Sequence, residues 1–337
     1  MLELRDVSRT LGREPILTRA SFQFTSEIPT AVLGLSAPAR ESFLRLLSGA
    51  DKPQTGSIRL GGKDVSQARR EKGRIVRIGR HGVKPSGQKA GKLAGREALE
   101  RVRLGARLDV AVSELDLDQR LRLAIASAQA AKPLLILLDA PSADLALDIR
   151  ERFVADLGQM LSDTGAVVVL AAGAADEALG LGGQALVLDR GRILQAAHAA
   201  DLFGHPANLT VALATSHPVL NTLAMQARAG QGLLADGSTF QPPDTLRLPS
   251  DGACTLAFRP EDTTLDRRGA QCVRFIVRAL GEETIAGRRF LRVHFAGADW
   301  LAPHAVATPP PGMVLNVFVD RSRLMVFDAE GRAHSVS

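Results

Sequence analysis

Aromatic residues and long apolar runs are both scarce in this sequence of 337 residues. Tyrosine is absent, tryptophan occurs once, and aromatic residues make up only 4% of the chain. The uncharged apolar runs, such as Ala166 to Ala175, fall well short of the ~20 residues that a membrane-spanning helix needs. The first residues, MLELRD, do not resemble a signal peptide either. We therefore expect neither a membrane-spanning helix nor an export signal.

Cysteine and histidine give no metal-binding pattern. The two cysteines, Cys254 and Cys272, lack metal-ligand spacing and are expected in the core. With no export features, a reducing cytoplasm is the simplest compartment. The seven histidines are scattered without such spacing too, so no residue is assigned as a metal ligand.

Positive charge is in excess, and it concentrates in one stretch. The net charge is +6 and the pI is about 9.9, which suits nucleic acid or anionic lipid headgroups. Residues 69–108 are basic and rich in glycine, but no aromatic side chain is interleaved there to stack on bases. We therefore expect a solvated or membrane-facing surface and no nucleic acid partner. The 45% hydrophobic content suffices for a sizeable core, and we expect two domains from the length of the chain.

The segment from Leu134 to Arg150, LLILLDAPSADLALDIR, organises the chain. Its continuous Leu/Ile run predicts a parallel strand that is buried on both faces and ends at Asp139, because Pro141 stops the strand. In open α/β sheets, ligands bind at the carboxyl ends of the strands. The sequence thus predicts a carboxylate at the ligand-binding edge of an α/β sheet.

A second segment, GLSAPARES, follows the apolar run 30–33 and precedes a helix, which is the position of a phosphate-binding loop. Such a loop needs glycines whose N–H groups point at phosphate, a lysine, and a Ser/Thr for Mg²⁺. Alanines occupy the glycine positions, Pro38 lacks an N–H, Arg40 replaces the lysine, and Glu41 replaces the hydroxyl. Arg40 and the helix N-terminus leave some attraction for anions. The candidate residues of this degenerate nucleotide site are Gly34, Ser36, Ala37, Ala39, Arg40, Glu41, Ser42 and Asp139, and we expect ATP and Mg²⁺ to bind weakly or not at all.

These two segments resemble the phosphate loop and the Walker B strand with its D-loop in ATP-binding-cassette (ABC) ATPases. The resemblance implies that each catalytic position is changed. Ala140 stands in the place of the catalytic Glu, Ala146 in that of the D-loop Asp, Arg80 in that of the Q-loop Gln, and Gly173 in that of the switch His. No residue is therefore assigned a catalytic role, and the chain alone is predicted to be inactive.

Residues 114–130, ELDLDQRLRLAIASAQA, resemble the ABC signature and its helix, where the family has Leu-Ser-Gly-Gly-Gln. Gln119 is retained, but Asp116, Leu117 and Asp118 replace the serine and the two glycines. In the family this motif contacts the γ-phosphate held by the opposite subunit, so we expect the two carboxylates to repel it. The helix itself should be amphipathic, with residues 121, 125 and 128 on its buried face.

After about Asn221 the sequence changes to short alternating segments with Gly/Pro turns, which predicts a β-rich domain. LAFRPEDT at 256–263, with the stretch 309–328, resembles the regulatory domain of the oligonucleotide/oligosaccharide-binding (OB, also TOBE/MOP) type in carbohydrate and polyol importers. We therefore expect an α/β P-loop nucleotide-binding domain at 1–221, with a trimmed helical subdomain, and an OB-fold-like domain at 222–337.

The resemblance implies a subunit of a carbohydrate or polyol importer, peripheral on the cytoplasmic face of the inner membrane. Its expected partners are membrane-spanning permease subunits, a second, active ATPase subunit and, indirectly, a periplasmic binding protein. One alternative is a weakly active transport ATPase that still uses Asp139 and Arg40. The other is a soluble regulator that binds protein or nucleic acid through its basic middle.

Overall fold

The computed structural model describes residues 1–65, 73–244, 246–266, 272–285, 287–303 and 308–334. The chain divides into two compact units, Met1–His205 and Pro206–Ser337. This division falls earlier than the boundary expected between residues 221 and 222. The reason is that helix α8 (Leu209–Ala214) packs Ala212 with Leu220, Ala257 and Phe327 of the second unit.

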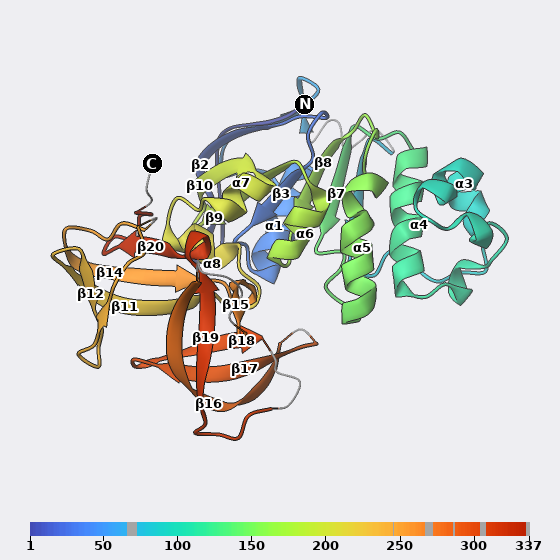
Figure 1. The fold of residues 1–337 in the computed structure, drawn as a ribbon. Helices are drawn as coiled ribbons and strands as arrows, with labels where there is room; N and C mark the ends of the chain where they lie inside the picture. The colour runs from blue at the N-terminus through green and yellow to red at the C-terminus, as the bar shows by residue number, and fades with distance from the viewer. Residues whose placement is uncertain (66–72, 245, 267–271, 286, 304–307, 335–337) are drawn as a thin grey trace. The chain divides into compact units, whose positions relative to one another are not determined.

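The first unit contains an antiparallel and a mainly parallel sheet (Figure 1). The antiparallel sheet has the order β2 (Glu14–Phe24), β1 (Leu2–Leu11), β4 (Thr55–Leu60) and β5 (Lys63–Asp64). The second sheet has the order β10 (Arg192–His198), β9 (Gln184–Asp189), β3 (Thr30–Leu33), β8 (Val167–Ala171), β7 (Leu135–Asp139) and β6 (Ile75–Gly79). Only β10 pairs antiparallel in this second sheet. The α/β class expected for this part of the chain is confirmed.

Strand β7 has the environment that its sequence predicts. It lies between β6 and β8 and pairs parallel with both. Leu135 and Leu137 join the core cluster that also holds residues of helix α1 (Ala37–Leu47) and of the antiparallel sheet. Because alternate residues of a strand point to opposite faces, Ile136 and Leu138 fill the other face, and they too are fully buried. Asp139 is left at the carboxyl edge of the sheet.

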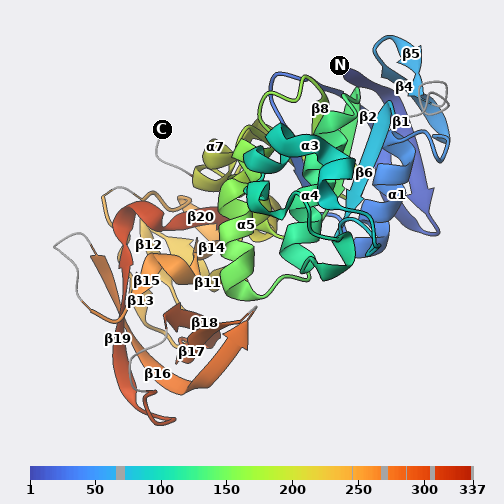
Figure 2. The same ribbon diagram turned by 90° about the vertical axis from the view of Figure 1, so that its right-hand side faces the viewer.

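Over its described residues, the first unit has further helices of 6 to 14 residues. They are α3 (Ala90–Arg101), α4 (Leu117–Ala130), α5 (Leu147–Met160), α6 (Ala175–Leu181) and α7 (Ala199–Gly204), with 3₁₀ turns at Gly105–Arg107 and Val112–Glu114. Helices α3 and α4 pack together at one end of the unit (Figure 1), the end that faces the viewer in Figure 2. Residues Leu121, Ile125 and Ala128 of α4 are buried, as its pattern predicts. Within the described ranges, no helix combines the length and the apolar character needed to cross a membrane.

The second unit is β-rich, as expected, and consists of two five-stranded antiparallel sheets around one core. One sheet has the order β13 (Thr239–Phe240), β12 (Gln231–Leu233), β11 (Asn221–Arg228), β14 (Asp251–Phe258) and β20 (Met325–Asp328). The other has the order β15 (Thr263–Thr264), β19 (Val314–Asp320), β16 (Cys272–Ile285), β17 (Arg288–Phe295) and β18 (Ala298–Pro303). An edge-to-face contact between Trp300 of β18 and Phe258 of β14 joins the two sheets, with ring centroids 4.9 Å apart.

Candidate nucleotide site

The loop between β3 and α1 keeps one glycine for a packing reason. Gly34 has a φ of +88°, and a Cβ on it would lie 2.0 Å from the carbonyl oxygen of Leu188 in β9. An L-residue with a side chain fits neither the dihedral angle nor the space. Gly34 thus fixes the route of the chain from the sheet into α1, whether or not a phosphate binds there.

Helix α1 begins where a phosphate loop would normally continue. Ser36 is its N-cap, and its Oγ accepts a hydrogen bond of 3.3 Å from the Ala39 N–H. The Arg40 N–H donates to the Ser36 carbonyl at 2.8 Å, and Pro38 has no N–H. The N–H groups of Ala39 and Arg40 are therefore used within the helix start. Ala37 begins the helix, and its substitution for glycine suits this earlier start.

Arg40 turns toward the Walker B carboxylate. Its Nε lies 3.2 Å from Asp139 Oδ1, and its Nη1 donates to the Leu35 carbonyl at 3.4 Å. Both side chains of the ion pair are largely buried, with exposed fractions of 15% and 26%. The structure thus brings together the two ends of the predicted site, β3–α1 and β7, but it joins them directly. The guanidinium and the carboxylate neutralise each other where lysine, phosphate and Mg²⁺ would meet.

Glu41, the replacement for the Mg²⁺-binding hydroxyl, also has an internal partner. Arg77 of β6 contacts it in a bidentate pair, with Nη1–Oε1 at 3.2 Å and Nη2–Oε2 at 2.6 Å. The hydrogen bond from Arg77 lowers the pKa of Glu41 below its ordinary value. Glu41 is therefore an anion at neutral pH, and its charge is balanced by an arginine rather than by a metal ion.

A third ion pair occupies the Q-loop position. Arg80, just after β6, places its Nε 3.4 Å from Asp144 in the turn that follows β7, and His81 Nδ1 lies 3.7 Å from the same carboxylate. The next residue, Gly82, has a φ of +61°, and a Cβ on it would lie 2.6 Å from the backbone of Arg120 in α4. The segment that replaces the Q-loop is thus held between the D-loop turn and the signature helix.

The positions of the catalytic Glu and the switch His lie against each other. A Cβ built on Gly173 would be 2.8 Å from the Cβ of Ala140, too close for both to keep their places. Glu177 lies behind them, 1% exposed, and accepts hydrogen bonds from the Gly173 N–H at 2.7 Å and from the N–H and Oγ of Ser142 at 2.9 and 2.6 Å. Burial raises the pKa of Glu177. Its carboxyl group connects the turn after β7 to the turn after β8.

The two carboxylates of the signature segment make contacts within their own helix, and their expected repulsion of a γ-phosphate stays a prediction. Asp116 caps α4: its Oδ1 accepts from the Gln119 N–H at 2.8 Å, and Gln119 Oε1 accepts from the Asp116 N–H at 3.3 Å. Asp118 accepts two hydrogen bonds from Arg122 Nε, at 2.9 and 3.0 Å. Burial nevertheless raises the pKa of Asp118, against the effect of Arg122. Leu117 is the first residue of the helix.

Arg122 extends this network into the interior. Its Nη1 lies 3.0 Å from Asp156 Oδ2 in α5, and its guanidinium carbon lies 5.7 Å from the centre of the Phe153 ring. Arg103 reaches the other oxygen of Asp156 at 2.8 Å. A pocket of about 440 Å³ opens beside these groups and the start of α4. Four of the charged groups in its lining, Arg103, Asp118, Arg122 and Asp156, are paired with one another.

Sequence reasoning missed the partners of the predicted residues. Arg77, Asp144 and Arg122 were not singled out, although each forms an ion pair with a motif residue or its replacement. The spacing of Asp118 and Arg122, four residues apart on a predicted helix, was the one available signal. Arg77 carried no such signal, because its contact depends on the position of β6 in the sheet.

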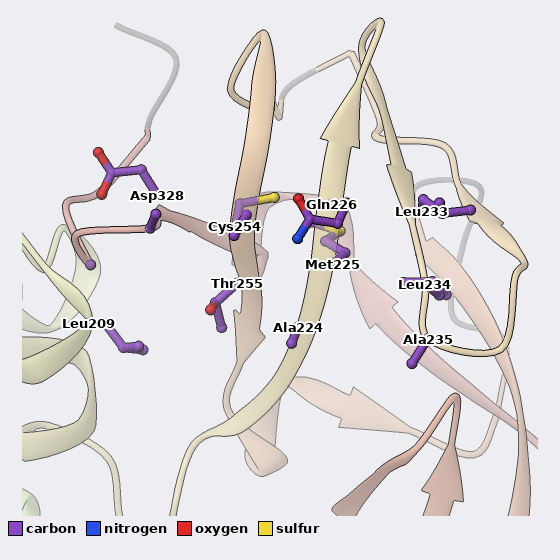
Figure 3. A pocket seen from close by; sticks show the side chains of 13 residues that line it. Leu209, Ala224, Met225, Gln226, Leu233, Leu234, Ala235, Cys254, Thr255 and Asp328 are labelled. Atoms are coloured by element: carbon purple, nitrogen blue, oxygen red, sulfur yellow. The ribbon is translucent and has the colours of Figure 1, made fainter.

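The second unit has a pocket of its own, of about 430 Å³, between β11, β14, α8 and the turn after β20 (Figure 3). Its floor is formed by small and apolar side chains such as Ala224 and Ala253. Asp328, the one charged residue of the lining, already pairs with Arg332 at 2.8 Å. Over the described ranges, no group of three His, Cys, Asp or Glu side chains could hold a metal ion. The lining of this pocket therefore gives no reason to place nucleotide binding or catalysis in the second unit.

Comparison with known proteins agrees with the arrangement of the first unit. No family model matches the chain. A sulfate/thiosulfate import ATP-binding protein from Chromobacterium violaceum is 26% identical over 98% of this chain and 96% of its own length. Spermidine/putrescine import ATP-binding proteins from Mesoplasma florum and Pseudomonas aeruginosa are 26% and 27% identical over 80% and 79% of this chain. They are matched over 82% and 78% of their own lengths.

The chain is similar to ABC transporter ATP-binding proteins. The solved structure of cbiO1 from Clostridium perfringens, part of the ABC transporter complex cbiONQ, has the same fold, with a TM-score of 0.52. That match is 18% identical and covers 60% of this chain and 90% of the other. The α/β fold is therefore that of an ABC ATPase.

The residues present do not fit Mg-ATP in this ABC-type site. Arg40 is paired with the carboxylate that would face Mg²⁺, and Glu41 is paired with Arg77 in place of a metal-binding hydroxyl. A triphosphate would have to displace both ion pairs and approach the Glu41 charge. We derive no catalytic step through a nucleotide here.

Proposed function

We propose that this chain is a non-hydrolysing ATP-binding-cassette subunit of a membrane importer. The observation that carries the proposal is the pairing of Arg40 with Asp139 and of Glu41 with Arg77, within a fold that otherwise keeps the ABC arrangement. The chain serves as a structural partner, docked on membrane-spanning permease subunits at the cytoplasmic face of the membrane. A second, active ATPase subunit supplies ATP hydrolysis, and a periplasmic binding protein supplies the solute.

The relatives support a role in import, but they do not agree on one solute. Those named above import either anions, sulfate and thiosulfate, or the cations spermidine and putrescine. Their common property is thus import through a permease. The carbohydrate or polyol class, suggested by the Arg259-Pro260-Glu261 segment, has no counterpart among these relatives. The OB-like character of the second unit and its regulatory role belong to the same proposal.

The two half-sites of such a complex would differ. The half-site built on this chain's phosphate loop is filled by its own ion pairs. The opposite half-site would receive the start of α4, where Asp116 caps the helix and Asp118 is paired with Arg122. Both carboxylates nevertheless remain at the helix end that would face the partner's γ-phosphate, and their charges would oppose its binding. Exchanging Asp116, Leu117 and Asp118 for Ser, Gly and Gly should raise the activity of the complex more than repair of the phosphate loop.

Titration of the purified full chain with Mg-ATP, together with an ATPase assay, tests the proposal. We expect a Kd above ~1 mM and hydrolysis at background, because general-base catalysis alone contributes ~10²–10⁴ in rate. A matched variant restores the loop by the changes Ala37→Gly, Pro38→Ser, Ala39→Gly, Arg40→Lys and Glu41→Ser, and it should bind more tightly. Mg²⁺-dependent turnover that Asp139→Asn abolishes would instead establish the weakly active ATPase.

A second experiment addresses the importer role. A tagged chain, expressed with the genes beside its own in the genome, should be recovered from membranes together with a permease and another ATPase subunit. Recovery only as a free chain, or with nucleic acid, would contradict the proposal and favour the soluble regulator.

A further inference from the structure

Exposed apolar side chains gather on one face of the second unit. Ile276 and Leu280 of β16 and Met313 and Val314, at the start of β19, all lie on its surface. Ile276 is 55% exposed and Val314 58%. The two strands are hydrogen-bonded neighbours (Figure 1), with Arg278 opposite Val314 and the Ala279 N–H donating to the Met313 carbonyl at 2.8 Å. Because opposite residues of an antiparallel pair point to the same face, Val314 shares the outward face of Arg278, whereas Met313 lies opposite the buried Ala279. The outward residues Ile276, Leu280 and Val314, with Arg274 and Arg278, form what we call the β16–β19 patch.

The fold does not require these side chains to be apolar. On β16, the alternate residues Phe275, Val277 and Ala279 are buried in the core, so the residues between them point outward. An outward face of an antiparallel sheet is ordinarily polar. Ile276 and Leu280 thus leave 55% and 37% of their surface exposed to solvent on this face. Contiguous exposed apolar surface of this kind marks an interaction site.

The two arginines of the patch have no carboxylate partner within the described residues. Arg278 donates only to the Gly312 carbonyl, at 3.3 Å, and Arg274 has no ion pair. The next strands of the same sheet differ, because His294 and Arg292 both pair with Asp299, at 2.7 and 3.2 Å. The charge of the neighbouring surface is therefore balanced internally, whereas the charge of the patch is left for a partner.

The positions of the two arginines indicate which kind of partner can bind. Arg274 and Arg278 lie on either side of Ile276 along β16, so a two-fold axis through the patch would place arginines against arginines. A second copy of the chain is thus disfavoured. An anionic lipid surface would meet only two unpaired cations, and attraction to lipid grows with the number of basic residues. A polypeptide with carboxylates can form a bidentate pair with each guanidinium and cover the apolar residues between them.

We propose that the β16–β19 patch docks an acidic, amphipathic segment of a partner protein. Four residues along a strand span ~13 Å, so the segment carries two carboxylate groups about that far apart, with apolar side chains between them. The interaction does not depend on the nucleotide site. It would survive even if the chain proved to hydrolyse ATP.

Site-directed photo-crosslinking in the host cell tests this docking surface in the full-length chain. A photoreactive benzoylphenylalanine replaces Asn316, an exposed residue opposite Ile276. The adduct, mapped by mass spectrometry, should contain a segment with acidic residues around apolar ones. The combined change Arg274→Glu and Arg278→Glu should lower the adduct yield about tenfold, equal to ~1.4 kcal/mol. The matched control, Arg228→Glu on the exposed side of β11, should leave the yield unchanged.

A synthetic peptide of the mapped segment provides the quantitative measurement. It should bind the purified chain, and the double charge reversal should weaken its binding by a similar factor. The proposal is overturned if no adduct forms, if the adduct joins the patch to the same chain or to a second copy, or if the mapped segment carries no carboxylates. Binding of the chain to vesicles of equal parts phosphatidylglycerol and phosphatidylcholine, lost on the same charge reversal, would identify a membrane contact instead.

Discussion

Removal of the Arg40–Asp139 ion pair is the most direct test of whether this ion pair takes the place of Mg-nucleotide in the site. Arg40→Met keeps most of the aliphatic stem without the charge, Asp139→Ala removes the carboxylate, and the double variant completes a thermodynamic cycle. Two unit charges ~4 Å apart attract each other by ~4 kcal/mol at an effective dielectric constant of 20. The exposed fractions of 15% and 26% mean that desolvation offsets a large part of this attraction.

We expect a coupling free energy of ~1–2 kcal/mol, between the value for a surface pair and the full attraction. The control cycle uses Arg152 and Asp148 of α5, an exposed pair at 3.2 Å, for which we expect ~0.3–0.5 kcal/mol. Urea unfolding followed by hydrogen-exchange mass spectrometry of α1 and β7 peptides measures the first unit separately from the second. Exchange of these peptides should also be the same with and without Mg-ATP.

Two results would refute the reasoning. The first is a coupling no larger than that of the control pair, which would mean that Arg40 and Asp139 do not stabilise each other. The second is a clear stabilisation of the wild-type chain by Mg-ATP. A ligand at 100 times its Kd adds ~2.7 kcal/mol, so even modest binding would be detected.

Three further predictions concern the buried groups around this site. Arg122→Met should lower the free energy of unfolding by ~3–5 kcal/mol, because it leaves two partly buried carboxylates without their common partner, and urea unfolding measures the loss. Gly173→Ala should lower the free energy of unfolding by ~1–3 kcal/mol, because the new Cβ would lie 2.8 Å from the Cβ of Ala140. Adding Ala140→Gly should restore this stability, since it removes that Cβ and since Ala140 has a φ of +38°, which suits glycine. If the double variant is no more stable than Gly173→Ala, the strain lies elsewhere. Burial raises the folded-state pKa of Glu177, so its contribution to stability should be present below about pH 4.5 and should fall as the pH rises through the folded-state pKa. Glu177→Gln should remove this pH dependence from unfolding curves measured from pH 4.5 to 8. Parallel pH profiles of the wild-type chain and the variant would contradict this prediction.

The sequence alone predicts which residues of the candidate site are replaced, but it does not predict the contacts that the replacements make. Pro38 and Glu41 alone indicate that a phosphate loop is chemically changed, because a missing N–H and an added carboxylate are properties of single residues. The repulsion of a γ-phosphate expected at Asp116 and Asp118 stays a prediction. Both carboxylates are engaged by the helix that they begin, through a cap and an i,i+4 pair. Local spacing contained that information, since both partners lie within one helical turn.

The sequence by itself determined the local elements of this protein. The apolar run that ends at Asp139 specifies a buried parallel strand, and the spacing of residues 121, 125 and 128 specifies the buried face of α4, because both patterns depend only on side-chain periodicity. Tertiary structure alone decided what the changed site contains. Arg40 pairs with a residue 99 positions away, and Arg77 with one 36 positions away. Such contacts follow from the order β3-β8-β7-β6 in the sheet, which places distant strand ends at one edge.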